Sequence, residues 1–235
     1  MERKNDLQRL SGFKMPQRLS LDYITYHYYF RDLKDTFDAY IKENDTIFDI
    51  GCGNKPFDTY IRSLTKNGDY RGCDVVQSSE HKVDIICEAT NILEPANKYD
   101  VVICTQVVEH VFDHAKVFGE AYRLLKPGGY FIMSGPFIWM LHEEPYDFFR
   151  FTKYGFRKLF ENAGFTIKEE KANGGKYAAL GQLMIHVICN GSGKNFFVKN
   201  IRAVMILFYN TIFSWLDDKK KDESYTLNYV FVGQK

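Results

Sequence analysis

Short apolar runs alternate with helical segments over most of this chain, and that alternation limits the fold more than any other feature. Parallel strands that helices cover on both faces read as near-continuous apolar stretches. The helical segments between such runs supply the crossovers that parallel strands need. The order predicts an α/β fold with a doubly wound, mostly parallel sheet of seven strands. The first five strand-like runs are residues 46–50, 70–75, 83–87, 99–105 and 130–134.

The segments around these runs divide the chain into two predicted parts. Residues 1–45 are expected to form a polar N-terminal arm followed by a helix, and residues 46–235 to form the main domain. Within that domain, Asp113 and Thr152 are candidate N-caps of two helices. Gly164 is placed to end the second of these helices.

The last third of the chain departs from the simple alternation. Two predicted strands, 165–171 and 225–233, enclose an apolar helical insertion at about 175–216. Its longest uncharged run is shorter than the roughly 20 residues that span a bilayer. We expect this helix to pack over the sheet edge or the functional site; a dimer face, or a membrane-surface helix assisted by Lys199 and Arg202, are the alternatives. The side chains expected on one side of it are Phe197, Ile201, Val204, Met205, Phe208, Ile212 and Trp215.

Charge and cysteine content exclude several classes of protein. The formal net charge is +1, so the chain lacks the broad basic field that holds a nucleic-acid backbone. The five cysteines are odd in number and form no Cys-x-x-Cys pair, which favours buried thiols in a reducing cytosol. The polar N-terminal residues contain no apolar core of signal-peptide length. These features predict a cytoplasmic protein that does not bind nucleic acid.

The loop after the first predicted strand carries the strongest functional signal. Gly51 and Gly53, separated by one residue, let the backbone turn sharply and approach a ligand closely. A dinucleotide site needs a third glycine where this chain has Pro56, a residue suited to the first turn of a following helix. Asp49 would repel a pyrophosphate but suits a cationic amino group, and Asp74 has the spacing of an acid that binds ribose hydroxyls. The loop therefore favours an aminoacyl-nucleoside over a dinucleotide.

Residues 46 to about 170 resemble the class I S-adenosylmethionine-dependent methyltransferases, in particular the bacterial group called methyltransferase type 11 or 12. The segment 49–53 resembles the first motif of that family, 88–90 the segment that borders the adenine, 105–111 the fourth motif, and 125–129 the run before the fifth strand. Two departures are Lys55, where the family often has a third glycine, and Glu88, where it more often has Asp. The resemblance implies S-adenosylmethionine as the cofactor. The residues it places on that cofactor are Asp49, Gly51, Cys52, Gly53, Asp74, Val75, Glu88, Ala89, Thr105 and Gln106.

Candidates for a general base lie after the fourth and fifth predicted strands. The stretch 136–152 resembles a His-x-x-Pro-x-Asp-x-x-Arg-x-Thr signature found in a subset of these bacterial enzymes. We expect His142 to act as general base, and His110 either to share that role or to orient the cofactor loop. Asp147 and Arg150 are expected to form an ion pair that holds the loop. The acids near His142 have no recognised metal-ligand spacing, so no metal site is expected.

The resemblance implies methyl transfer to a small molecule or glycan, with a sugar hydroxyl as the expected acceptor. A quinone or lipid-like acceptor is one alternative, and a non-catalytic module that binds the cofactor is another. Nucleic-acid methylation is disfavoured, because the chain has no Asn-Pro-Pro-Tyr-type site for a flipped base. Peripheral membrane contact and a homodimer remain open as further partners.

Overall fold

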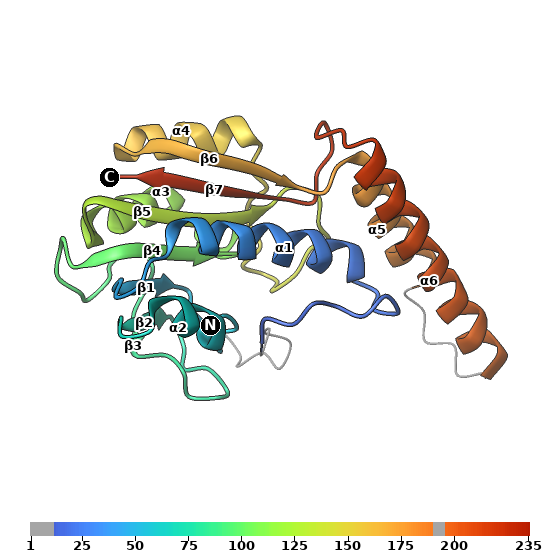
Figure 1. The fold of residues 1–235 in the computed structure, drawn as a ribbon, viewed down its shortest axis with the longest axis horizontal. Coiled ribbons are helices and arrows are strands. Elements are labelled where there is room, and N and C mark those ends of the chain that lie inside the picture. The colour runs from blue at the N-terminus through green and yellow to red at the C-terminus, as the bar shows by residue number, and fades with distance from the viewer. Residues whose placement is uncertain (1–11, 190–195) are drawn as a thin grey trace.

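A seven-stranded sheet forms the centre of the molecule (Figure 1). The computed structural model describes residues 12–189 and 196–235. The strands lie in the order β3-β2-β1-β4-β5-β7-β6; β1 to β5 are parallel, and β7 runs antiparallel to both of its neighbours. This arrangement confirms the predicted fold class. The bounds are β1 Ile47–Ile50, β2 Tyr70–Asp74, β3 Ile85–Ile86, β4 Tyr99–Thr105, β5 Leu125–Pro136, β6 Thr166–Asn173 and β7 Asn228–Gln234.

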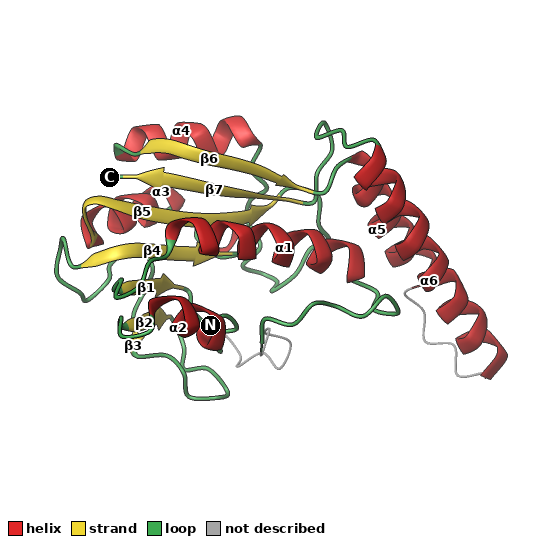
Figure 2. Cartoon of the chain, in the orientation of Figure 1, coloured by secondary structure: helices red, strands yellow, loops and turns green. Residues whose placement is uncertain are grey.

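Helices cover both faces of this sheet (Figure 2). Helices α1 and α2 pack on one face, against strand residues such as Val101 and Ile103. Helices α3 and α4 pack on the other, against Val102 and Cys104. Neighbouring residues of β4 thus enter different core layers, which explains why that strand reads as continuously apolar. The bounds are α1 Tyr23–Tyr40, α2 Asp58–Thr65, the 3₁₀ helix η1 Val108–His110, α3 His114–Leu124, α4 Lys153–Ala163, α5 Lys176–Cys189 and α6 Phe196–Lys219.

Local details confirm some of the predicted boundaries and correct others. Thr152 caps α4, with its Oγ1 accepting a hydrogen bond from the Gly155 amide at 3.2 Å. Asp113 precedes α3 but caps no amide, because its carboxylate pairs with Lys116 instead. Pro56 lies before the first turn of α2, not within it, since that helix has Phe57 as its N-cap.

The third strand is much shorter than predicted. The Asp84 carboxylate accepts the Gly72 amide hydrogen at 2.7 Å, a donor that a longer β2–β3 ladder would use. The same carboxylate binds the ammonium of Lys55. Only Ile85 and Ile86 therefore pair with β2.

Helices α5 and α6 form a hairpin, here called the arm, that projects beyond the sheet (Figure 1). The arm packs on the N-terminal half of α1, where residues such as Ile24 meet Ile185 and Ile206. Among the described residues, α6 is the one helix long and apolar enough to cross a bilayer by length and composition, and only 11% of that segment is buried. The expectation that its apolar side packs over the sheet edge or the functional site is wrong, because the protein leaves that side exposed. The exposed residues of that side are Phe197, Ile201, Val204, Phe208 and Trp215.

Candidate functional site

A cavity of about 1040 Å³ opens at the carboxyl ends of the parallel strands. Strand order reverses between β1 and β4, and ligands of doubly wound sheets bind at such a switch point. All the side chains that the sequence pointed to as cofactor-binding line this cavity, as do both candidate histidines. Which of them contact a bound cofactor stays a prediction. The lining residues from that set are Asp49, Gly51, Cys52, Gly53, Asp74, Val75, Glu88, Ala89, Thr105, Gln106, His110 and His142.

The glycine loop is fixed against the end of β2. The amides of Gly51 and Cys52 both donate to the carbonyl of Cys73, at 2.8 and 2.9 Å. The Gly53 amide donates to the Asp74 carboxylate at 3.1 Å. Gly51 has a φ of 71°, and a Cβ on it would lie 2.4 Å from a methyl carbon of Val107. The loop therefore tolerates no side chain at this position.

Asp49 lies at the floor of the cavity with 2% of its surface exposed. The Tyr70 hydroxyl donates to its carboxylate at 2.6 Å. Burial raises the pKa of Asp49 to about 7, against the opposing effects of the Tyr70 hydrogen bond and the Lys55 charge. A buried carboxyl poised near neutral pH would gain much from a cationic group placed beside it.

Lys55 stands where the resembled family often has a third glycine, and its φ of 49° lies in the left-handed region that glycine favours. Its side chain is buried and binds the Asp84 carboxylate at 2.5 Å. A hydrogen bond to the Tyr70 carbonyl at 3.4 Å adds a second contact. This departure therefore keeps the backbone shape of the loop while using the side chain to hold it.

Arg150, Asp147 and His142 form a chain of polar contacts that ends at the lining of the cavity. Arg150 binds Asp147 through both of its terminal nitrogens, at 2.5 and 2.7 Å. The Asp147 carboxylate also lies 3.2 Å from His142 Nδ1 and accepts the His142 amide hydrogen at 3.0 Å. Burial raises the pKa of Asp147, but hydrogen bonds from Arg150 and from the His142 amide outweigh it and hold the pKa at about 2. The ion pair that the sequence predicted is present, and it also orients His142.

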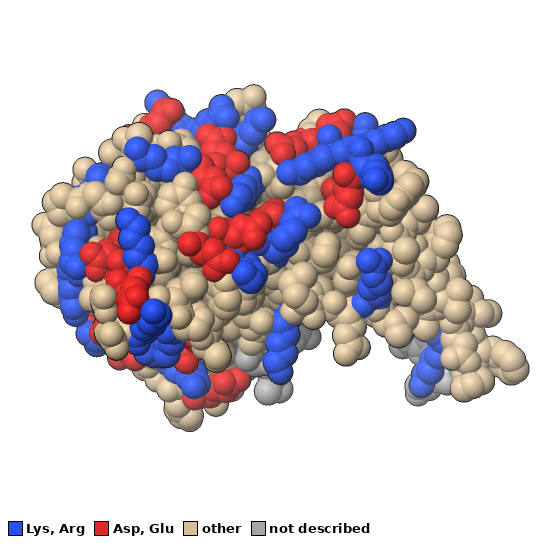
Figure 3. Space-filling model, viewed as in Figure 1, with Lys and Arg blue, Asp and Glu red and all other residues tan. Residues whose placement is uncertain are grey.

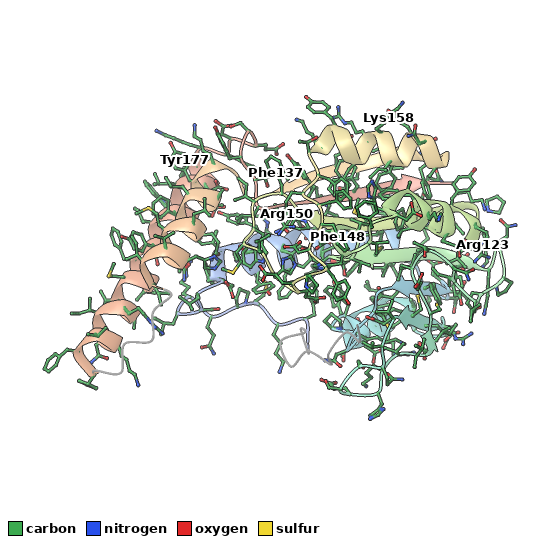
Figure 4. The ribbon with its side chains drawn as sticks, turned by 180° about the vertical axis from the view of Figure 1, so that it is seen from behind. Arg123, Phe137, Phe148, Arg150, Lys158 and Tyr177 are labelled. Atoms are coloured by element: carbon green, nitrogen blue, oxygen red, sulfur yellow. The ribbon has the colours of Figure 1, made fainter. Side chains whose placement is uncertain are left out.

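Figure 4, viewed from behind, shows Phe137, Phe148 and Arg150 in the loop after β5, between the sheet and the arm. This loop is joined to η1, because the Glu109 carbonyl accepts the amides of Phe148 and Phe149 at 2.9 and 3.2 Å. The His110 ring lies edge-on to the His142 ring, with their centroids 4.7 Å apart. His110 Nδ1 is 3.0 Å from the carbonyl of Tyr146. The two candidate histidines therefore form one packed pair on the cavity wall.

Glu109 is a buried carboxyl that sequence reasoning did not single out. It has no exposed surface, neither carboxyl oxygen has a hydrogen-bond partner among the described residues, and His110 Nε2 lies 3.8 Å from its Oε1. Burial raises its pKa to about 8. Within residues 12–189 and 196–235, Glu109, His110 and His142 form the one group of metal-ligating types whose ligand atoms all lie within 4.8 Å of one another. The Glu109-His110 pair is visible in the sequence, but His142 joins it only through the loop after β5.

Sequence reasoning missed the contribution of α1 to the cavity. Thr25, Tyr26 and Tyr29 of α1 line it, and the Tyr29 hydroxyl lies 3.1 Å from Ser134 Oγ. Trp139 lines it from the loop after β5. Tyrosines with a polar tip on an otherwise apolar helix face were the available signal.

The arm adjoins this wall of the cavity through two contacts. Thr25 donates through its amide and its hydroxyl to Gln182 Oε1 of α5, at 3.2 and 3.1 Å. The Trp139 ring packs on His186 of α5, with centroids 5.2 Å apart. Two side chains that line the cavity thus rest directly on the arm.

Comparison with known proteins identifies relatives in sequence and in fold. A family model described as a methyltransferase domain matches residues 23–170. A ubiquinone biosynthesis O-methyltransferase of Hydrogenovibrio crunogenus is 31% identical over 106 residues, which are 39% of this chain and 43% of that protein. The chain therefore aligns with less than half of the length of that relative.

Two solved structures share the fold at identities too low to indicate more than the fold. A methyltransferase from Archaeoglobus fulgidus, described as S-adenosylmethionine-dependent, has a TM-score of 0.56 and 17% identity, with 87% of this chain and 94% of that chain covered. The cyclase SpnF has a TM-score of 0.59 and 15% identity, with 89% and 83% covered. Because a cyclase shares the architecture, the fold alone does not fix the reaction.

Proposed function

The chain belongs to the class I S-adenosylmethionine-dependent methyltransferases, and we propose that it methylates a hydroxyl oxygen of a small-molecule or glycan acceptor. The observation that carries the proposal is the Arg150–Asp147–His142 chain, which brings an oriented imidazole to the cavity that the glycine loop also lines. A non-catalytic cofactor-binding module has no need for a histidine held in this way.

The described residues fit this cofactor. A glycine cradle that a Cβ would fill at Gly51 allows close approach of the ligand. Asp49 would face the cationic amino group, and Asp74 would accept hydrogen bonds from the ribose hydroxyls. Glu88 and Ala89 would border the adenine. The sulfonium of the bound cofactor supplies a methyl group that is already activated for transfer.

The geometry of the His142 ring suits a general base. Its Nδ1 lies near two acceptors, the Asp147 carboxylate at 3.2 Å and the Met140 carbonyl at 3.3 Å. Nδ1 must therefore carry the ring proton of the neutral imidazole, which leaves the lone pair on Nε2. That lone pair would take the proton of an acceptor hydroxyl as the oxygen attacks the methyl carbon. The proposed order is thus Arg150 fixing Asp147, Asp147 fixing the tautomer of His142, and His142 removing the proton.

His110 is the second candidate for this role. The Tyr146 carbonyl can only accept a hydrogen bond, so His110 Nδ1 donates to it and the neutral ring has its lone pair on Nε2. Its edge-on contact with His142 also restricts rotation of that ring. We assign His142 as the base because the Asp147 carboxylate lies beside its Nδ1 and stabilises the imidazolium while Nε2 takes the proton. The Glu109 carboxyl near His110 instead lies 3.8 Å from Nε2 itself, the atom that would have to reach the acceptor.

Replacing His142 with Asn tests the proposed base. With an acceptor identified from a panel of sugars and nucleotide sugars, we expect the release of S-adenosylhomocysteine to slow about 10²–10⁴-fold. Calorimetry should show unchanged S-adenosylhomocysteine affinity. His81→Asn is the matched control, because His81 is exposed outside the cavity and Asn tolerates its φ of 54°. Unchanged turnover in the His142 variant would exclude the role, and tight cofactor binding without turnover on any acceptor class would favour the non-catalytic module.

A quinone or lipid-like acceptor is the second candidate, and two observations favour it. The relatives that match in sequence include ubiquinone biosynthesis O-methyltransferases. The wall of the cavity rests on the apolar arm through Thr25 and Trp139. Adding soluble phenolic and quinol acceptors to the panel separates this candidate from a sugar acceptor.

A cytoplasmic location is also part of the proposal, because all five cysteines are free thiols, as expected in a reducing compartment.

A further inference from the structure

One side of α6 presents an exposed apolar stripe. Its members are spaced at four, three, four and seven residues, which places them on one side of a helix. Their exposed fractions lie between 54% and 73%, so each of these side chains presents more than half of its surface to solvent. We call this set the α6 stripe; it consists of Phe197, Ile201, Val204, Phe208 and Trp215.

The opposite side of α6 is fixed to the protein by buried polar contacts. Asn210 donates to the carbonyls of Arg18 and Ser20 at 2.6 and 2.9 Å. The Asp217 carboxylate accepts the amides of Gly175 and Ala178 at 2.8 and 3.0 Å. Because these bonds orient the helix, the α6 stripe faces outward. A helix held along its side in this way can lie on a membrane surface but cannot cross a bilayer without breaking them.

Most of the arm, from residue 177 to residue 216, carries charge of one sign. From residue 177 to residue 216 the sequence contains Lys194, Lys199 and Arg202, and it contains no Asp or Glu. Figure 3 shows the surface over α6 as mostly uncharged, with blue but no red toward its free end, whereas both signs intermix over the rest of the molecule. An anionic lipid surface complements this charge. A second copy of this segment would instead bring cations toward cations, with no acid between residues 177 and 216 of either copy to pair with them.

We propose that the arm docks on an anionic lipid surface, with the α6 stripe in the interface between headgroups and acyl chains and with Lys199 and Arg202 at the level of the headgroups. Large apolar side chains along one side of a helix, with Lys and Arg on its other sides, are a feature of helices that lie in the plane of a membrane. The docking rests on the surface of the arm alone and does not depend on the acceptor. Its failure would leave the proposed methyl transfer untouched.

Vesicle flotation of the full chain tests this docking. We expect flotation with vesicles of phosphatidylcholine and phosphatidylglycerol, and several-fold weaker flotation with phosphatidylcholine alone. Val204→Asp should lower the vesicle partition coefficient about tenfold or more, because it places a charge in the stripe. Leu93→Asp is the matched control, since Leu93 and Val204 are both 68% exposed and Leu93 lies outside the arm. It should leave the partition coefficient within about twofold of the parent.

Three outcomes would overturn the docking. The parent chain does not float with anionic vesicles, the two variants lower the partition coefficient equally, or the parent chain floats equally well with and without the anionic lipid. Sedimentation equilibrium in lipid-free buffer identifies a different occupant. If the parent chain is a dimer that Val204→Asp dissociates, and no vesicle binds, the stripe is a dimer face. Calorimetry with S-adenosylhomocysteine should give the same affinity for both variants and the parent, which shows that a loss of flotation reflects the stripe and not unfolding.

Discussion

Asp49 combines almost complete burial with a position on the ligand cavity. An isolated buried carboxylate is costly, and the protein reduces this cost through the Tyr70 hydroxyl and through the charge of Lys55. Burial still dominates and raises the pKa of Asp49 to about 7. Near neutral pH the free protein therefore contains both protonated and ionised Asp49.

This pKa gives S-adenosylhomocysteine binding a defined pH dependence. A cationic amino group beside Asp49 favours the carboxylate, so the pKa of Asp49 falls on binding and a proton is released. Affinity should rise by up to about tenfold per pH unit as the pH approaches 7 from below, and level off above it. Calorimetry in two buffers of different ionisation enthalpy measures the released proton.

Asp49→Asn should bind less tightly and should release no proton. Glu80→Gln, in an exposed acid away from the cavity, should behave like the parent. Binding enthalpies that are identical in the two buffers would show that the amino group does not lie beside Asp49.

Lys55 shows what a sequence conceals at the scale of one residue. Lys55 stands where the resembled family often has a third glycine, so the backbone conformation of the loop could not be predicted from the sequence. The structure shows a left-handed Lys55 whose ammonium binds Asp84, 29 residues further along the chain. No local pattern contains that partner, because only the β2–β3 crossover brings it under the loop.

Among the elements, the buried strands were the most predictable. β4 begins and ends at the predicted residues, because a strand buried on both faces leaves an uninterrupted apolar signal. β3 was overestimated, since the Asp84 side chain takes the amide that would extend it. The apolar side of α6 was predicted to pack against the rest of the protein, but it is exposed to solvent. An apolar stripe indicates that something covers it and does not say whether that is the same chain.

The glycine loop allows a sharp test at this scale. Gly51→Ala puts a Cβ 2.4 Å from Val107 at a φ of 71°, so the loop must move. We expect it to lower the free energy of unfolding by about 1–3 kcal/mol and S-adenosylhomocysteine affinity about tenfold or more. Urea titration and calorimetry measure the two effects.

Gly119→Ala is the control for that substitution. Gly119 lies in α3 with nothing within 4 Å of a Cβ, so the added methyl should stabilise the helix by up to about 1 kcal/mol and leave affinity unchanged. Equal behaviour of the two alanine variants would show that the Gly51 turn is not required for binding.

At the scale of the whole molecule, the sequence predicted most of the strand and loop residues that line the cavity, but not the contribution of α1. Asp49, Asp74 and Thr105 come from three strands and line one cavity, because parallel strands end at a shared edge. Tyr29 also lines it, yet its place depends on how α1 packs on the sheet. Periodicity identifies elements, whereas packing between distant elements is settled only in the folded chain.

The sheet should unfold as one unit, and Phe231 of β7 tests this. Its buried ring contacts Phe160 of α4 and Phe156, with centroids 5.6 Å apart in each case. Phe231→Ala should lower the free energy of unfolding by about 3–5 kcal/mol, in a single urea transition seen equally by circular dichroism and fluorescence. Tyr154→Ala, exposed on the same helix as Phe160, should cost less than about 1 kcal/mol. Two separate transitions would contradict a single cooperative sheet.

The position of β7 also has a consequence for how the chain is made. β6 leaves the ribosome first, but β7 lies between it and β5, so β6 has no partner strand until Asn228–Gln234 has followed. During that interval β5 presents an unpaired edge to other nascent chains, and such edges are templates for aggregation. The arm is made in the same interval and exposes its own apolar stripe. We therefore expect newly made chains to depend on chaperones that shield both surfaces until β7 has been made.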